Sequence, residues 1–223
     1  MKLVHPALTM KFDFGNEYAK EWVIESPELF YRFTQEMNLQ CSGEEGEFIL
    51  SDEIKVYPLS KKMEFIVSPF LINLEDKKLL SKLYENLKEL AYNESNFMFT
   101  QEINNKLLQY LLELENQTNH VLMMNDEVDL VCLFKAASIK FEECDGSLLE
   151  TIFKYIELVN ELLKKEIIVL VNFRSYLNDD QMHELIKMVQ YREIAVLIIE
   201  SYQRDCIEGC KQYIIDCDQC EIY

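Results

Sequence analysis

Two continuous apolar runs, residues 167–171 and 194–199, form the clearest pattern of hydrophobic and polar positions in the chain. Neither run alternates with polar residues, which is typical of strands buried on both faces of a parallel sheet. The segment between them is long enough for a helical crossover, and Asn178 precedes apolar residues at helical spacing. These features predict a strand–helix–strand unit and therefore an α/β core.

The N-terminal part of the chain predicts further strands around one helix. Residues 20–25 and 63–67 have the composition of strands, and a Ser-Pro-Glu sequence that starts at Ser26 is typical of a helix start. Residues 48–59 predict a hairpin. We expect residues 63–67 to lie in the same sheet as residues 167–171, although a long segment separates the two in the sequence.

That long segment has a different pattern. Residues 73–122 contain no glycine, leucine recurs at helical spacing, and a break at residues 92–95 separates two long helices. The sequence predicts that a helical leg domain, residues 73–145, interrupts an α/β head domain made of residues 1–72 and 146–223. Long amphipathic helices of this kind are typical of self-association, although packing within one chain would produce the same spacing.

Composition narrows the class of protein. A hydrophobic content of 49% with 12% aromatic residues excludes a disordered chain. No apolar run approaches the ~20 residues of a membrane span, and the N-terminus meets charged residues too early for a signal peptide. Seven cysteines without a secretion signal predict reduced thiols. We therefore expect a cytoplasmic protein that has no contact with a membrane.

The net charge of −18, from 22 basic and 40 acidic side chains, repels nucleic acid on average. Binding of DNA would need basic residues segregated from the acidic ones, divalent cations, or both. Residues 130–141 contain no acidic residue and include Lys135 and Lys140. They are candidates for phosphate contacts, and two solvated lysines beside a buried turn are the alternative interpretation.

Residues 68–76 follow an expected strand, at the place where a phosphate-binding loop would lie in a nucleotide-binding α/β fold. Such a loop needs glycines, so that backbone amides can approach the phosphates, and then Lys and Ser or Thr. Residues 68–76 contain no glycine, and the chain has no Gly-Lys-Ser/Thr sequence. Lys77 and Lys78 are therefore expected to be solvated helix residues, and hydrolysis of a nucleotide is not expected at this turn.

The chain resembles the Csn-two family, the adaptation proteins of type II-A CRISPR systems. The matching features are a strand with a glycine-free turn, LFKAASIKFEE from Leu133, KKEIIVLVN from Lys164, SYLNDDQM from Ser175, and QYIID from Gln212. They cover most of the chain in order and spacing. The resemblance implies a degenerate P-loop-like head with a parallel sheet core and a helical leg. It also implies a tetrameric ring that binds Ca²⁺, takes ends of double-stranded DNA into a basic channel during spacer acquisition, and has no catalytic activity.

The resemblance also directs attention to particular residues. Sequence-independent, salt-dependent contacts with DNA phosphates are expected at Lys135, Lys140, Lys164 and Lys165, with Arg174 a weaker candidate. Calcium prefers about six to eight oxygen ligands. The candidate ligands are Glu115, Asp126, Glu127, Asp129 and Glu142, and a second acidic group continues with Glu143 and Asp145. An acidic loop that only caps a helix is the alternative. Gln117, Asn119 and His120 stand where relatives tend to carry carboxylates, so the number of calcium sites stays open.

Four cysteines near the C-terminus have the spacing C-x₃-C-x₆-C-x₂-C, and four thiolates can hold zinc in a tetrahedron. These residues are Cys206, Cys210, Cys217 and Cys220. The alternative is that they are free thiols on the last strands, because residues 213–215 between the two pairs predict a strand.

The sequence thus predicts a non-catalytic, calcium-dependent homotetramer that binds double-stranded DNA, prefers linear ends and works with other CRISPR adaptation proteins. Two alternatives stay open. One is an enzyme, a diverged P-loop NTPase. The other is a scaffold that binds other proteins through its leg helices.

Overall fold

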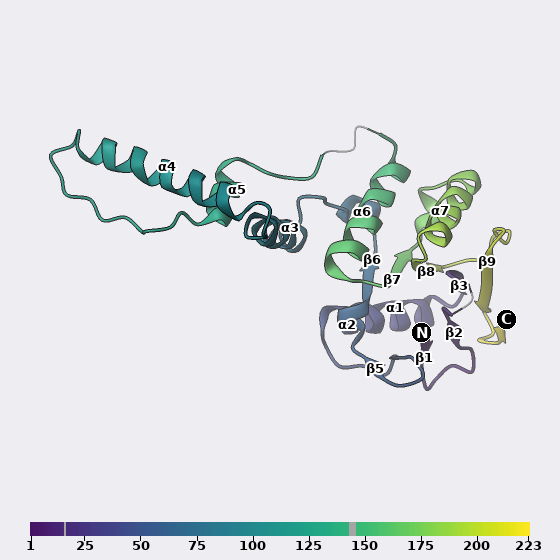
Figure 1. The fold of residues 1–223 in the computed structure, drawn as a ribbon. Helices are drawn as coiled ribbons and strands as arrows, with labels where there is room; N and C mark the ends of the chain where they lie inside the picture. The colour runs from purple at the N-terminus through teal and green to yellow at the C-terminus, as the bar shows by residue number, and fades with distance from the viewer. Residues whose placement is uncertain (16, 143–145) are drawn as a thin grey trace. The chain divides into compact units, whose positions relative to one another are not determined.

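The computed structural model describes the chain except residues 16 and 143–145 (Figure 1). It divides into two compact units. We call Met1–Asn73 with Cys144–Tyr223 the larger unit, and Leu74–Glu143 the helical unit. The second domain boundary expected from the sequence, after residue 145, falls at residues outside the described part of the chain.

A six-stranded sheet forms the centre of the larger unit, in the order β10-β9-β3-β8-β7-β6. The strands are β3 (Ala19–Ile24), β6 (Met63–Ile66), β7 (Ile167–Val171), β8 (Ala195–Glu200), β9 (Cys210–Ile215) and β10 (Glu221–Ile222). All neighbours pair in parallel except β10, which is antiparallel to β9. Every residue of β7 and β8 is buried, and β6 pairs with β7. The predicted α/β core and the pairing of these distant strands are therefore confirmed.

One face of this sheet packs against α1 and a small antiparallel sheet. Helix α1 (Pro27–Ser42) begins where Ser26 Oγ accepts a hydrogen bond from Leu29 N, and it ends at Gly43, whose φ of 103° favours glycine. The small sheet has the order β2-β1-β4-β5, with β1 (Lys2–Val4), β2 (Phe12–Asp13), β4 (Ile49–Ser51) and β5 (Val56–Tyr57). Side chains from all three parts form one core, including Trp22, Phe33, Leu50 and Val169.

The opposite face of the large sheet is covered by α6 (Leu148–Leu163) and α7 (Asp179–Tyr191), which Figure 1 shows on the side away from α1. Both helices begin with a capping box, in which a Ser or Asn side chain and a Glu or Gln side chain exchange hydrogen bonds with the backbone. The apolar stripe predicted for α7 is buried: Met182, Leu185, Ile186 and Val189. Short helical turns complete this unit: α2 (Leu59–Lys62), η1 (Pro69–Leu71) and η2 (Phe173–Ser175).

The helical unit contains α3 (Lys77–Ala91), α4 (Phe97–Glu115) and α5 (Leu130–Ala136). Helix α3 packs against α5, where Tyr84 contacts Phe134 and donates a hydrogen bond to the carbonyl of Ile139 at 2.9 Å. In contrast, α4 has no buried residue. None of the described helices is long and apolar enough to cross a membrane.

Candidate functional site

Two lysine pairs that are far apart in the sequence meet at the amino ends of β6 and β7. We call Lys61, Lys62, Lys164 and Lys165 the lysine cluster. One pair ends α2 just before β6, and the other follows α6 just before β7. Because β6 and β7 are parallel neighbours, both pairs lie at the same edge of the sheet. The backbone joins them directly, since Glu166 N donates a hydrogen bond to the carbonyl of Lys62 at 2.8 Å.

Lys165 holds the cluster together. Its Nζ donates to the carbonyls of Ser60 at 2.6 Å and Met63 at 2.9 Å, and it lies 3.6 Å from the carboxylate of Glu64. Two donors of the ammonium group are thus used by backbone carbonyls, and its charge is paired with Glu64. The side chain of Lys165 is only 13% exposed, so it positions the segment and leaves the outer surface to its neighbours. Lys62 is partly committed as well, because it pairs with Glu166.

Lys61 and Lys164 are the exposed members of the cluster. Lys164 ends α6 in the left-handed region, with φ 56° and ψ 33°, where glycine is the usual residue. Its charge is favourable there because cations interact well with a helix C-terminus. On one side, Lys164 borders an open cavity of about 560 Å³ that is also lined by Glu157, Asn160, Glu161, Glu166, Arg192 and Ile194. The three glutamates make that cavity unsuitable for an anion.

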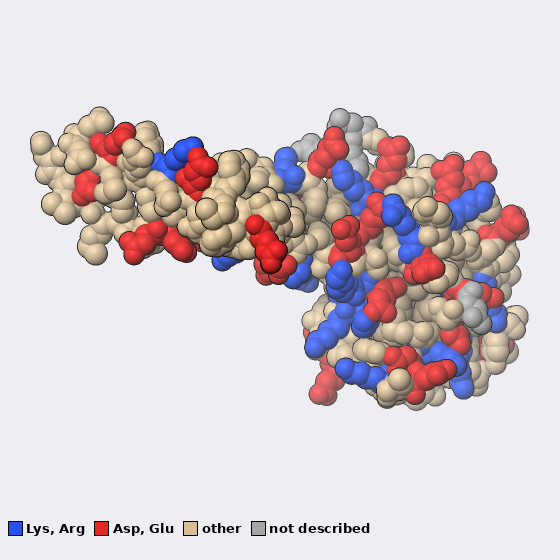
Figure 2. Space-filling model, in the orientation of Figure 1, with Lys and Arg blue, Asp and Glu red and all other residues tan. Residues whose placement is uncertain are grey.

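The distribution of surface charge supports the lysine cluster as a candidate site for binding a polyanion. On the face shown in Figure 2, Lys and Arg side chains gather over α2, whereas acidic side chains are spread over most other parts of the larger unit. The chain as a whole carries a net charge of −18. A local group of cations on an acidic protein is the segregation that binding of a polyanion requires.

The other lysines predicted to contact DNA lie in the helical unit. Lys135 is exposed on α5. Lys140 Nζ donates to the carboxylate of Glu75 at 2.7 Å. The two lysines therefore belong to a different compact unit from Lys164 and Lys165.

The prediction that Arg174 contacts DNA is corrected by its position in the interior. Arg174 is 3% exposed, and its guanidinium donates to Glu21 at 2.8 Å, Asp179 at 3.0 Å and the carbonyl of Asp205 at 3.0 Å. It follows β7, at the carboxyl ends of the parallel strands, where α/β proteins usually bind their ligands. The side chain of Arg174 fills part of that region itself, and DNA phosphates cannot reach it.

The turn after β6 also lacks a phosphate cradle. Ser68 Oγ accepts a hydrogen bond from Phe70 N at 3.3 Å, and Pro69–Leu71 then forms a 3₁₀ turn. The side chain of Phe70 is 83% exposed. Phosphate loops instead present a row of backbone amides made accessible by glycine.

The five predicted calcium ligands are not gathered into a cage. Glu115 Oε1 accepts a hydrogen bond from Leu122 N at 2.7 Å, while Asp129 caps α5 by accepting from Val131 N at 2.9 Å. A hydrogen bond from the Cys132 thiol, together with that backbone bond, lowers the pKa of Asp129. The remaining candidates, Asp126, Glu127 and Glu142, are exposed. Among the residues the structure describes, no three of the five bring ligand oxygens within 4.8 Å of one another. Glu143 and Asp145 lie outside the described residues.

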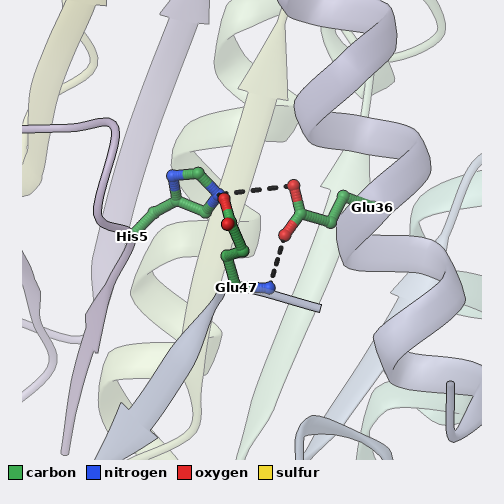
Figure 3. A group of neighbouring side chains, drawn as sticks. All are labelled: His5, Glu36 and Glu47. Atoms are coloured by element: carbon green, nitrogen blue, oxygen red, sulfur yellow. Dashed lines mark hydrogen bonds and ion pairs between the residues drawn. The ribbon is translucent and has the colours of Figure 1, made fainter. Parts of the chain in front are cut away.

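One group of metal-ligand type was not predicted: His5, Glu36 and Glu47 (Figure 3). His5 Nε2 lies 3.3 Å from a carboxylate oxygen of Glu36 and 3.6 Å from one of Glu47. His5 Nδ1 accepts a hydrogen bond from Ala7 N at 3.1 Å, so the ring proton is on Nε2 and is directed at the carboxylates. A metal-binding histidine has the reverse arrangement, because its second nitrogen donates. The three side chains therefore form a polar contact that joins the end of β1, helix α1 and the segment before β4.

The four C-terminal cysteines are not brought to one point. Strand β9 runs from Cys210 to Ile215, and at about 3.3 Å per residue its two ends are roughly 17 Å apart, with Cys206 and Cys210 at one end and Cys217 and Cys220 beyond the other. Zinc needs each sulfur about 2.3 Å from the ion. A single zinc site with all four thiolates is therefore incompatible with the fold. Burial raises the pKa of the Cys210 thiol, and Cys217 Sγ lies 3.6 Å from a carboxylate oxygen of Glu25.

Comparison with known proteins identifies the family. A family model described as "CRISPR-associated protein (Cas_Csn2)" matches residues 40–219, which is most of the chain. The chain belongs to the Csn2 family. The predicted resemblance is thus confirmed.

Two relatives carry the name CRISPR-associated protein Csn2. The protein from Streptococcus agalactiae is 29% identical over 108 residues, which cover 48% of each of the two chains. The protein from Enterococcus faecalis is 26% identical over 117 residues, which cover 52% of this chain and 48% of the relative. The matched part of this chain therefore spans about half the length of the relatives.

The Csn2 match includes all four lysines of the cluster. Sequence reasoning identified Lys164 and Lys165 but missed Lys61 and Lys62, because only the pairing of β6 with β7 brings them together. The Lys-Lys pair directly before an apolar strand was the available signal. His5, Glu36 and Glu47 have no informative spacing in the sequence.

Proposed function

We propose that this Csn2-family chain binds double-stranded DNA through phosphate contacts, without reading the base sequence and with a preference for linear ends. Membership of the family supports a role in CRISPR adaptation. The lysine cluster is the observation that carries the DNA-binding part of the proposal. Lys61 and Lys164 offer exposed ammonium groups that the fold holds at one edge of the sheet, and Lys165 fixes the backbone beneath them.

We further propose that the chain acts as a ring-forming homotetramer. Helix α4 supports this part, because its 19 residues include none that is buried. The exposed fractions are 76% for Met98, 65% for Phe99, 57% for Tyr110 and 50% for Leu112. Exposed apolar surface on this scale marks an interaction site, and the ring that the family resemblance implies makes a second copy the simplest partner. Other CRISPR adaptation proteins are expected to dock on the assembled ring.

Calcium dependence is also part of the proposal, and it rests on charge and on the family resemblance. The predicted ligands of a single chain do not fit the roughly six to eight oxygens of a calcium cage. No step of DNA binding is therefore assigned to the ion. The role proposed for calcium is to reduce the repulsion between DNA and a chain of net charge −18.

A catalytic role is not proposed. The turn at Ser68 lacks glycine, and the side chain of Arg174 occupies the carboxyl edge where a nucleotide would bind. An assay for ATP and GTP turnover tests this point. Turnover that persists when the protein is purified with a different affinity tag would restore the NTPase alternative.

The central experiment measures the affinity of purified protein for labelled linear duplex, with closed circular DNA as competitor, in Ca²⁺ and in EDTA. The double variant Lys61→Glu/Lys164→Glu is compared with Lys187→Glu, which changes an exposed lysine of α7. We expect the double variant to lose affinity, the control to retain it, and circular DNA to compete poorly. Equal binding by the double variant and the wild type would remove the lysine cluster from the proposal. Failure of the wild type to bind DNA under any condition would favour the protein scaffold.

A further inference from the structure

The carboxyl ends of the strands hold a buried group of charges that the proposed function does not use. Glu21 lies on β3, Glu200 ends β8, Arg174 follows β7, and Arg204 lies in the segment after β8. Glu21 and Glu200 are both 0% exposed, and Arg174 is 3% exposed. Buried charges are stable only when they are paired or neutralised, so each of these groups needs a partner.

The acidic and basic side chains of this group are not paired one to one. The Arg174 guanidinium is shared by Glu21 at 2.8 Å and Asp179 at 3.0 Å. Within the described part of the chain, Glu200 pairs with no guanidinium, and its Oε1 accepts the backbone N–H of Arg174 at 3.0 Å. The remaining cation is Arg204, but its guanidinium donates to the carbonyl of Arg174 at 2.7 Å and to the hydroxyl of Tyr202.

The same group of side chains contains buried polar atoms that lack a hydrogen-bond partner within the described chain. Four buried side-chain polar atoms lack a partner within the described chain, and three of them belong to this group: Arg174 Nε, Glu200 Oε2 and Arg204 Nε. An ionised Glu200 would therefore be a second buried anion near Glu21, with one oxygen unsatisfied. Desolvation raises the pKa of Glu200 to about 7, and Glu21 acts in the same direction, while the backbone N–H of Arg174 and the charges of Arg204 and Arg174 oppose it.

Glu200 also belongs to a set of bonds that joins the segments after β7 and β8. Asn172 N donates to the carbonyl of Ile199 at 2.8 Å, and Ser201 N donates to Asn172 Oδ1 at 3.2 Å. The bond from Arg174 N to Glu200 continues this connection. The two segments carry Tyr176 and Tyr202, which are 44% and 48% exposed. We call this set of bonds the edge clip.

We propose that Glu200 is a proton-binding site that controls the edge clip. When Glu200 is protonated it is neutral, and the segments after β7 and β8 stay joined. Loss of the proton leaves a buried anion without a cation of its own, and the clip opens so that water can solvate the carboxylate. No charged group on α7 other than Asp179 takes part in the described bonds, and Asp179 contacts Arg174 rather than Glu200. The proposal does not depend on DNA binding.

Hydrogen exchange of the full chain tests the proposal. The amides of residues 172–178 and 201–206 are compared between wild type and Glu200→Gln at the same pH, which cancels the intrinsic effect of pH on exchange. Opening should increase as pH rises, because the closed form binds the proton more tightly than the open form. From the ordinary value of 4.5 and the raised value of about 7, the ratio of wild-type to variant exchange should rise about tenfold between pH 6 and 7.5 and then level off.

Two further measurements guard against a simple folding defect. Glu184→Gln, at an exposed position of α7, should behave like the wild type at every pH. Infrared difference spectra at pH 6 should show a protonated carboxyl band that Glu200→Gln lacks. Arg204→Gln should move the titration of that band to higher pH, because a cation near Glu200 is removed. An exchange ratio that is constant from pH 6 to 8, or absence of the protonated band at pH 6, would overturn the proposal.

Discussion

The two edges of the large sheet have opposite characters. At the carboxyl edge, where α/β proteins usually bind ligands, Arg174 and Glu21 are buried and bonded to one another. At the amino edge, Lys165 is bonded to the backbone while Lys61 and Lys164 are exposed. The difference shows that a parallel sheet can have its usual ligand region filled by the protein's own side chains. In such a protein the exposed charges of the other edge are the better guide to function.

The largest effect is expected from removing the cation of the carboxyl edge. Arg174→Met leaves Glu21 buried without its guanidinium partner. Breaking a buried ion pair by removing one partner costs about 3–5 kcal/mol in the free energy of unfolding. Urea denaturation followed by circular dichroism measures this change.

The control for Arg174→Met is the double variant Glu21→Gln/Arg174→Met, which removes the stranded charge together with its partner. It should recover part of the lost stability. If both variants unfold at the same urea concentration as the wild type, Arg174 does not stabilise the carboxyl edge, and the contrast between the two edges fails.

Much of this contrast was accessible from the sequence, and part of it was not. The continuous apolar runs identified β7 and β8, and the Ser26 and Asn178 caps located α1 and α7, because these signals are local. The burial of Glu21 in β3 had no local signal, since its partner Arg174 comes from a distant part of the sequence. For the same reason Arg174 looked like a surface residue, and Lys61 and Lys62 were overlooked.

The second effect concerns DNA affinity at the amino edge. In Lys61→Glu/Lys164→Glu, each lost phosphate contact should bring the negative slope of log affinity against log salt closer to zero by about 0.9. It should also lower the affinity near 0.1 M salt by about tenfold. Fluorescence anisotropy over a range of salt concentrations measures both quantities. An unchanged slope would mean that the two lysines do not neutralise phosphates, even if the affinity falls.

The third prediction distinguishes a structural role of Lys165 from direct contact between Lys165 and a DNA phosphate. Lys165→Met removes the donor to the carbonyls of Ser60 and Met63 and the partner of Glu64. Leaving buried acceptors unsatisfied costs about 1–3 kcal/mol, so the protein should lose stability. Because Lys165 presents little charge outside, the salt slope of DNA binding should stay close to that of the wild type. A slope reduced as much as in the double variant would show that Lys165 itself contacts phosphate.

The smallest effect has opposite signs for stability and binding, and it comes from Lys164→Gly. Lys164 has a φ of 56°, a conformation that costs an L-residue roughly 1–2 kcal/mol and costs glycine little. Loss of the charge at the helix C-terminus offsets about 0.3–1 kcal/mol of that gain. The free energy of unfolding should therefore rise by less than about 2 kcal/mol while DNA affinity falls. Glu193→Gly is the matched control, because Glu193 also has a φ of 56° and is not part of the cluster. It should gain stability without losing affinity. If both glycine variants bind DNA as the wild type does, the exposed charge of Lys164 serves the helix end alone, and DNA binding must be sought elsewhere than the amino edge.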